Sequence, residues 1–152
     1  MSLALEEAQK AFELDEVPVG AVITKGNEVI SKSHNFVEKF KNSTSHAEIN
    51  CIIGASKKLD SKFLNECDIY ITLEPCAMCA QAISFARIKR IYYGASDEKM
   101  GAIEHGARLF NVKNAIYVPE IYGDILSDKS EFLLKTFFKN KRVEKIKDLR
   151  LS

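Results

Sequence analysis

The sequence lacks the features that would assign it to a membrane, secreted or disulfide-rich class. None of its apolar runs approaches the ~20 residues that a membrane-spanning helix needs. The N-terminal stretch MSLALEEAQK has acidic residues where a secretory signal has basic ones, and it holds no long apolar segment. Only four cysteines occur, which does not suggest a disulfide framework in a chain of this size. We therefore expect a cytoplasmic protein with no membrane segment.

Internal repeats, low-complexity tracts and linkers are also missing from the sequence. Hydrophobic residues make up 46% of the chain and charged residues 28%, which is the composition of an ordinary globular protein. A length of 152 residues suits one domain. We expect a single domain over residues 1–152.

The net charge of +1 conceals an uneven distribution of charged side chains. Residues 1–16 carry five acids and one base, whereas residues 135–150 carry seven bases and two acids. A basic end can contact nucleic acid, but a basic run is more often the solvated face of a terminal helix. The charge distribution alone leaves both interpretations open.

Hydrophobic periodicity predicts helices that alternate with strands. Apolar residues at helical spacing predict helices over residues 2–14, 46–59, 76–87 and 127–147, and a short one over 107–111. Alternating or continuous β-branched runs predict strands over residues 19–24, 28–33, 67–73, 87–96 and 115–119. Pro75 is expected at the first helical position, and NFVEKFKNST, residues 35–44, is expected to be a polar loop. This order predicts an α/β fold, a sheet covered by helices.

The stretch TLEPCAMCAQAI, residues 72–83, places Cys76 and Cys79 three positions apart, directly after a predicted strand. Such a pair can bind zinc, act as a redox couple, belong to an iron–sulfur site or simply lie in the core. A redox couple in a thioredoxin-like fold also follows a strand. The position of the pair therefore does not decide between these interpretations.

A second stretch, SHAEI at residues 45–49, begins another predicted helix and contains His46. If the strands that precede the two helices are neighbours, the two helix starts converge at one edge of the sheet, where α/β folds bind ligands. One imidazole and two thiolates then form a three-ligand site. Zinc held by three protein ligands keeps its fourth position open for water, which is the catalytic form of a zinc site.

Glu48 is the candidate proton carrier of this site. Zinc lowers the pKa of its bound water toward ~7, and a carboxylate beside that water can move its proton to a leaving group. His-x-Glu combined with Pro-Cys-x-x-Cys is the known signature of zinc deaminases, in which the glutamate is not a metal ligand. A competing interpretation is a capping box, in which Glu48 bonds back to the backbone of Ser45.

The other cysteines and histidines have no partner at metal-ligand spacing. We expect Cys51 and Cys67 to be small core residues. We expect His34 and His105 to lie at the surface or in loops.

Taken together, the motifs resemble the cytidine deaminase-like zinc enzymes and, more narrowly, the bacterial tRNA-specific adenosine deaminases. The resemblance covers nearly the whole chain, and its stretches occur in the family's order: EVPVGAVI (16–23), HAEI (46–49), TLEPCAMCAQAI (72–83), RIKRIYYGA (87–95) and TFFKNKR (136–142). EVPVGAV together with LEPCAMC and the late double phenylalanine points to the tRNA enzymes within the superfamily.

The resemblance implies a homodimer of three-layer α/β/α subunits, each with a mixed five-stranded sheet. It implies one Zn²⁺ per subunit, held by His46, Cys76 and Cys79, with Glu48 moving protons. The implied reaction is the hydrolytic deamination of the wobble adenosine to inosine in a tRNA anticodon. The implied partner is therefore the tRNA anticodon stem-loop.

The candidate substrate contacts are Asn35, Ala47, Phe137, Phe138, Lys139 and Arg142. Of these, Asn35 corresponds to the base-contacting asparagine of the family, although the residues alone fit a turn position equally well. The basic C-terminal segment could hold phosphates of the RNA. The two phenylalanines could pack against its nucleotides or form the core of the last helix, and we expect at least one to be in the core.

One segment departs from the family pattern. After Asp97 the tRNA enzymes usually have small residues that end in Gly-Ser-Leu, whereas this chain has EKMGAIEHGARLFNVKNAIYVPEIY, residues 98–122. The resemblance therefore says nothing of how RNA or a second subunit is contacted there.

Two other functions remain open at this stage. A deaminase of free bases or nucleosides, such as guanine or cytosine, would use the same zinc motifs, and only the basic tail and the double phenylalanine favour tRNA. A zinc-stabilised RNA-binding protein without activity would not need a proton carrier, so the presence of Glu48 counts against it.

Overall fold

The computed structural model of the protein describes residues 1–151, with side chains described for residues 1–149. A five-stranded sheet in the order β2-β1-β3-β4-β5 forms its centre. The strands are β1 (Gly20–Lys25), β2 (Glu28–His34), β3 (Cys67–Leu73), β4 (Arg90–Ala95) and β5 (Glu120–Tyr122). β1 is antiparallel to both of its neighbours, whereas β3, β4 and β5 are parallel. The expected mixed sheet is confirmed.

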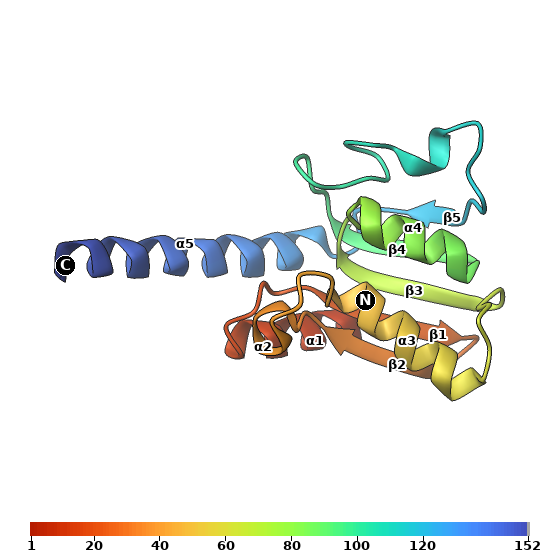
Figure 1. Ribbon diagram of the computed structural model, residues 1–152, viewed down its shortest axis with the longest axis horizontal. Coiled ribbons are helices and arrows are strands. Elements are labelled where there is room, and N and C mark those ends of the chain that lie inside the picture. Colours follow the sequence, from red (N-terminus) through yellow and green to blue (C-terminus); the bar gives the residue numbers. More distant parts are fainter. Residues whose placement is uncertain (152) are drawn as a thin grey trace.

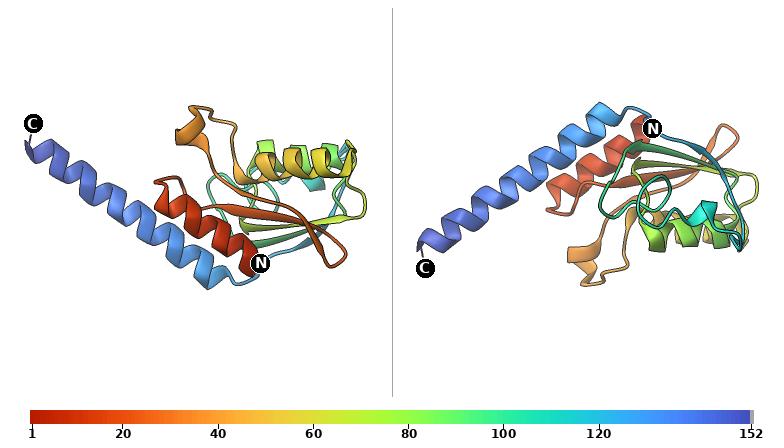
Figure 2. Two further views of the ribbon diagram at one scale, coloured as in Figure 1. Left: turned by 90° about the horizontal axis from the view of Figure 1, so that it is seen from below. Right: turned by 90° about the horizontal axis from the view of Figure 1, so that it is seen from above.

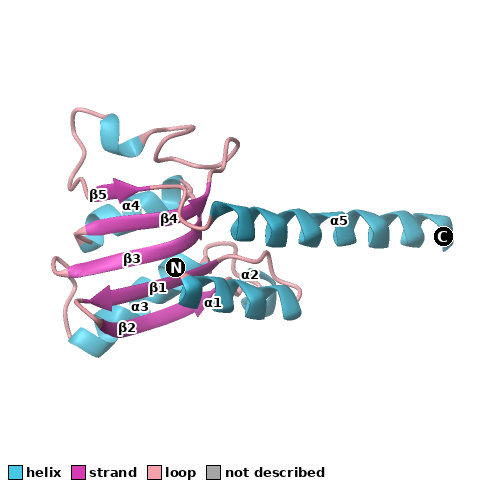
Figure 3. Ribbon diagram, turned by 180° about the vertical axis from the view of Figure 1, so that it is seen from behind, coloured by secondary structure: helices cyan, strands magenta, loops and turns pink. Residues whose placement is uncertain are grey.

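Helices cover both faces of this sheet, which gives the expected three-layer α/β/α arrangement (Figures 1 and 2). The helices are α1 (Ser2–Glu13), α2 (Val37–Phe40), α3 (Ala47–Leu59), α4 (Ala77–Ala86), the 3₁₀ turn η1 (Leu109–Asn111) and α5 (Ser127–Leu151). α3 and α4 lie side by side on one face, and α1 and α5 lie on the other (Figure 2). The C-terminal part of α5 extends beyond the sheet (Figure 3).

The core fills the space between the sheet and the helices. Isoleucines from the inner strands, among them Ile69, Ile71 and Ile91, form one cluster with Ile83 of α4. On the other face, Gly20 lets α1 approach the sheet closely, because a Cβ at Gly20 would collide with the backbone of that helix. The glycine of the EVPVGAV stretch therefore fixes α1 against β1.

The metal-site motifs meet at one sheet edge for a different reason from the one expected. β2 and β3 are not neighbours, because β1 lies between them. Since β1 is antiparallel to both, β2 and β3 run in the same direction and end at the same edge. The helix α4 begins at Ala77 with Cys76 as its N-cap, so Pro75 precedes the helix rather than opening it.

The predicted strand over residues 115–119 is wrong. In that segment the backbone of Tyr117 is tied to the Ser84 hydroxyl of α4, which accepts its N–H at 3.0 Å and donates to its carbonyl at 2.7 Å. The strand at the edge is β5, which pairs with β4 and begins at Glu120. The last helix continues to Leu151, beyond the expected end at residue 147.

Candidate active site

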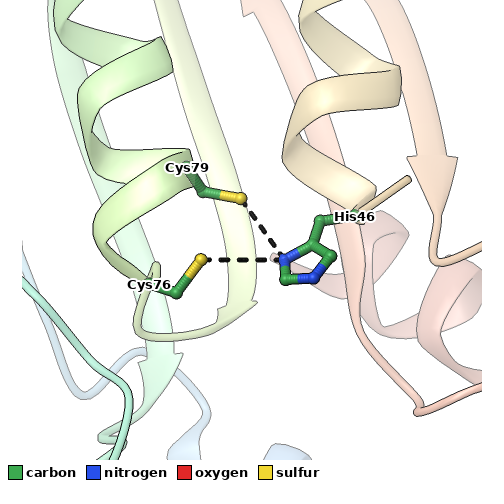
Figure 4. A group of neighbouring side chains, drawn as sticks. All are labelled: His46, Cys76 and Cys79. Carbon is green, nitrogen blue, oxygen red and sulfur yellow. Dashed lines mark hydrogen bonds between the residues drawn. The ribbon is translucent and has the colours of Figure 1, made fainter. Parts of the chain in front are cut away.

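Three potential metal ligands meet where α3 and α4 begin. His46 is the N-cap of α3, Cys76 is the N-cap of α4, and Cys79 lies in the first turn of α4. Figure 4 shows the three side chains pointing toward one another. The Nδ1 atom of His46 lies 3.7 Å from Sγ of Cys76 and 3.5 Å from Sγ of Cys79, and all three ligand atoms lie within 4.8 Å of one another.

These distances fit a tetrahedral metal site. Zinc–nitrogen bonds of about 2.0–2.1 Å and zinc–sulfur bonds of about 2.3 Å place tetrahedral N and S ligands about 3.6 Å apart. Within the described residues, this is the only group of three such side chains close enough to hold a metal ion. One imidazole and two sulfurs form a donor set that favours zinc.

Hydrogen bonding within the trio favours the thiolate of Cys76, whereas the same bond and burial raise the pKa of the Cys79 thiol. The hydrogen bond from Cys79 lowers the pKa of Cys76 to about 4 against the effect of burial, and His46 adds to this lowering. The hydrogen bond with Cys76 in turn raises the pKa of His46. A cysteine at a helix N-terminus is in any case a site where the thiolate is stabilised.

Glu48 lies beside the trio in the first turn of α3, with only 4% of its surface exposed. Burial raises the pKa of its carboxyl to about 7. The alternative capping box is wrong: the N-cap of α3 is His46, it makes no side-chain capping bond, and the Ser45 hydroxyl donates to Oδ1 of Asn50 at 3.1 Å. The Glu48 carboxyl is therefore available to the cavity beside it.

A cavity of about 960 Å³ adjoins the trio and is lined by His46, Cys76, Glu48 and Asn35, among others. Asn35 is held firmly, since its Oδ1 accepts the Ala47 N–H at 2.8 Å and its Nδ2 donates to the Val17 carbonyl at 3.1 Å. An amide group has two donors and two lone pairs, so Asn35 keeps one of each. The side chain of Ala47 is buried in the core, and its N–H is used by Asn35.

The expected contacts on α5 divide between the cavity and the surface. Phe137 is buried in the cavity wall, edge-on to Phe12 at 5.8 Å, whereas Phe138 is exposed. Lys139 and Arg142 are exposed and do not line the cavity.

A basic residue in this wall is Lys141, which sequence reasoning did not single out. It pairs with Asp15 at 2.5 Å, and its Nζ lies 5.8 Å from the centre of the Phe137 ring. Lys141 follows Phe137 by four residues in the sequence. Helical spacing alone would therefore have predicted that the two side chains lie on the same face of the helix.

Two buried glutamates, Glu16 and Glu74, accept hydrogen bonds from the segments that form the walls of the cavity. The Glu16 carboxylate accepts the N–H of Glu38 at 3.1 Å and that of Lys39 at 2.8 Å, which fixes the start of α2. Both glutamates come from the family stretches EVPVGAVI and TLEPC, but no spacing rule predicted that either would bind backbone N–H groups.

Glu74 organises the segment of residues 97–105, which departs from the family pattern. Its two oxygens accept the N–H groups of Asp97, Ile103, Glu104 and His105 at 2.8–3.1 Å and the Nδ1–H of His105 at 2.7 Å. These bonds lower the pKa of Glu74 despite its burial. The same segment pairs with Cys76 through an isolated bridge to Gly101.

The expectations for the remaining cysteines and histidines are met in part. Cys51 and Cys67 are buried core residues, as expected. His34 is buried rather than exposed, because its Nδ1 bonds to Glu7 of α1 at 2.9 Å. His105 does lie in a loop, but it has a partner in Glu74.

The comparisons with known proteins agree with this geometry. The model of the MafB19-like deaminase family matches residues 1–143. The tRNA-specific adenosine deaminase of Rickettsia typhi is 51% identical over 93% of this chain and 97% of that protein. The chain belongs to the tRNA-specific adenosine deaminases.

Two solved deaminase structures share the fold of this chain. The structure of a tRNA:A34 deaminase that edits A to I at the wobble position matches with a TM-score of 0.86 and 46% identity, over 88% of this chain and 97% of that one. The guanine deaminase of Nitrosomonas europaea matches with a TM-score of 0.76 and 19% identity, over 90% of this chain and 81% of that one. The second similarity shows only a shared fold.

Proposed function

We propose that this protein is a zinc-dependent tRNA adenosine deaminase that converts the wobble adenosine of an anticodon to inosine. The observation that carries the proposal is the His46, Cys76 and Cys79 trio with Glu48 in one cavity, in a chain of this family. One Zn²⁺ per subunit would be held by the trio. Residues 1–152 would act as one deaminase domain in the cytoplasm, where tRNA is used.

The bound metal would supply a Lewis acid that makes water nucleophilic at neutral pH. Glu48 would accept the proton of the attacking water and pass it to the amino group on carbon 6 of adenine. The new bond is C6–O, the broken bond is C6–N, and ammonia leaves. A carboxyl with a pKa of about 7 can both accept and release a proton near neutral pH.

The adenosine must leave the anticodon stack to reach the buried site. The remaining donor and acceptor of Asn35 would then hold the edge of the base, and Phe137 would close the cavity wall. Ala47 is buried and would act only by holding Asn35 through its N–H. Phe138, Lys139 and Arg142 are exposed on α5, so they would contact the RNA outside the cavity.

The protein would work as a homodimer. α3 and α4 lie side by side, and their outer surfaces carry large apolar side chains, Ile53 and Phe85, that are about half exposed. Apolar groups in neighbouring positions on an outer helix layer are typical of subunit contacts. Analytical ultracentrifugation should give the mass of two subunits, and Phe85→Glu should shift the mass toward one.

An inosine assay tests the proposed reaction. The zinc-loaded protein is incubated with an anticodon stem-loop that carries adenosine at the wobble position and, separately, with free adenine, adenosine, guanine and cytosine. Inosine should form only at the wobble base. Ammonia released only from free compounds would reject the tRNA substrate while keeping the zinc site.

The metal trio is tested separately from activity. Cys76→Ser and Cys79→Ser should lose bound zinc, as measured by elemental analysis, because each removes a thiolate ligand. Cys67→Ser is the matched control, since that cysteine is buried away from the trio and the zinc should remain. Glu48→Ala should keep the zinc and lose turnover, and an active Glu48→Ala protein would remove this residue from the mechanism.

A further inference from the structure

Two aromatic rings stack beside the cavity, in a segment expected to be only a polar loop. Phe36 stacks on Phe40 at 4.9 Å with an interplanar angle of 20°, and the His34 ring at the end of β2 lies 4.3 Å from Phe36, tilted by 42°. His34 is buried, whereas the side chain of Phe40 is 57% exposed. The Nζ atom of Lys39 lies 5.3 Å from the centre of the Phe36 ring and 5.9 Å from that of Phe40. We call Phe36, Lys39 and Phe40 the aromatic platform.

The platform adjoins the cavity beside the metal trio through Lys39, whereas the rings of Phe36 and Phe40 lie just outside the cavity lining. Its neighbours Val37 and Lys41, together with Lys39 itself, line that cavity. The two hydrogen bonds from the backbone of α2 to the buried Glu16 carboxylate fix the platform in this position. The rings are therefore presented by an anchored segment rather than by a mobile loop tip.

The chemistry of the platform suits a nucleotide better than another protein surface. Exposed aromatic rings in a basic groove bind single-stranded nucleic acid, because every base has a face that can stack on a ring. Lys39 supplies positive charge 5.9 Å from the centre of the exposed Phe40 ring, where a phosphate would follow the stacked base. Lys41, which pairs with Glu38, lines the same cavity. The cavity of about 960 Å³ reaches from this platform to Glu48, so a chain passing over the platform can lead into the site.

We infer that the aromatic platform binds the nucleotide next to the edited adenosine, with Phe40 stacked on its base and Lys39 close to its phosphate. This inference rests on the proposed function and adds a second binding position on the substrate RNA. Because stacking is tolerant of base identity, the platform would hold the RNA loop open without reading its sequence.

The absence of tryptophan from the chain allows a direct test. Phe40→Trp, in a Glu48→Ala background that prevents turnover, introduces the only tryptophan, and stacking of a base should quench its fluorescence as the stem-loop binds. Phe132→Trp is the matched control, since Phe132 is 72% exposed on α5 and lies beside Leu5 and Gln9 of α1, in a different hollow from the one that Lys39 lines. Equal quenching of both proteins would overturn the inference.

Kinetics identify the stacked nucleotide. Phe40→Ala should raise the KM for the stem-loop about tenfold with little change in kcat, and Phe40→Tyr should restore the KM. With stem-loops that carry an abasic nucleotide on the 5′ or the 3′ side of the edited adenosine, the effect of Phe40→Ala should disappear for one of the two. An effect that persists with both abasic RNAs, or no effect on the intact RNA, would reject the platform.

Rejection of the platform can be distinguished from rejection of the proposed function. If wild-type protein produces no inosine from any stem-loop, the tRNA substrate is wrong. If wild-type protein edits the RNA and Phe40→Ala edits it with an unchanged KM, only the platform is wrong. Far-ultraviolet circular dichroism of each variant controls for loss of the fold.

Discussion

Each of two walls of the cavity is held by a buried glutamate carboxylate, but the two carboxylates accept different numbers of hydrogen bonds. In the wall of residues 97–105, the Glu74 carboxylate accepts five hydrogen bonds, and the segment also pairs with the backbone of Cys76. In the wall that bears the aromatic platform, the Glu16 carboxylate accepts two. The wall that pairs with Cys76, a proposed metal ligand, is therefore the more constrained one. The wall that bears the aromatic platform, the proposed substrate contact, is anchored at one end and exposes its rings.

The difference follows from what each wall must hold. A metal ligand has to stay within a few tenths of an ångström of its position, since the bond lengths of a metal site are fixed. A stacking surface tolerates small displacements, because the attraction between a base and a ring varies slowly with lateral shift. Two hydrogen bonds are sufficient for the second task.

The largest effect is expected from Glu74→Ala. This change leaves the donors of five hydrogen bonds without their acceptor in a buried position, which should cost about 3–5 kcal/mol of unfolding free energy. Bound zinc should also be released more easily, because the segment that pairs with Cys76 loses its support. Urea denaturation and competition with a chelator measure the two effects.

Glu16→Ala is the matched variant in the other wall. It should cost about 1–3 kcal/mol, leave zinc binding unchanged and raise the KM for the stem-loop. If both variants lost zinc equally, the proposed division between a metal wall and a substrate wall would be wrong.

A smaller effect is expected from Gly101→Ala in the metal wall. An added Cβ would collide with the Asp97 carbonyl and with the Glu74 carboxylate, so the segment would have to shift at a cost of about 1–3 kcal/mol. Gly26→Ala is the control, because Gly26 has a φ of +56° but nothing within 4 Å of an added Cβ. The control should be destabilised without losing zinc, and only Gly101→Ala should reduce zinc affinity.

Glu7 bonds to His34, whose ring lies against Phe36 of the platform, and the stability that this bond contributes should depend on pH. Burial raises the pKa of Glu7, but its bonds to Lys10 and His34 outweigh this, and the pKa is lowered overall. A lowered carboxyl pKa stabilises the fold above the unfolded-state value of ~4.3, and this contribution is lost as the pH falls through the folded-state pKa. Glu7→Gln should therefore be less stable than wild type by about 1–2 kcal/mol at pH 7, and the difference should shrink below pH 4. A difference independent of pH would show that the charge of Glu7 is not involved.

The smallest effect is expected from Lys41→Ala. Lys41 and Glu38 form an exposed ion pair at 3.2 Å, and such pairs contribute little to stability, so the melting temperature should not change. If Lys41 meets a phosphate, the slope of log K against log salt for the stem-loop should fall by about 0.7. A lower melting temperature with an unchanged salt slope would assign Lys41 to the fold instead.

The sequence predicted those parts of the molecule whose signal is local. The run CDIYITL gave the bounds of β3 directly, because a strand buried on both faces is continuously apolar. His46, Cys76 and Cys79 were predicted as a group because ligand types at characteristic spacings stand at the starts of two helices.

The parts that the sequence did not predict depend on distant or backbone groups. The insertion of β1 between β2 and β3 pairs residues that lie 42 to 50 positions apart, such as Lys25 with Cys67 and Ala21 with Ile71, and periodicity gives no signal for such pairing. The four-residue helix α2 is shorter than a reliable helical pattern, and it is held by Glu16 from outside the segment. Four of the five donors to Glu74 are backbone N–H groups, and every residue except proline has one, so no residue pattern marks them.

The position of β1 between β2 and β3 also determines which parts of the molecule can form first. The β1–β2 hairpin and the β3–α4–β4 unit each consist of contiguous chain, so each can begin to form from local contacts. His46 follows the first unit and Cys76 belongs to the second, so the trio is complete only after β1 and β3 have paired. During refolding, uptake of the metal would therefore report the pairing of β1 with β3, which joins the two units. When zinc is scarce, this pairing would lack the stabilisation that metal binding adds.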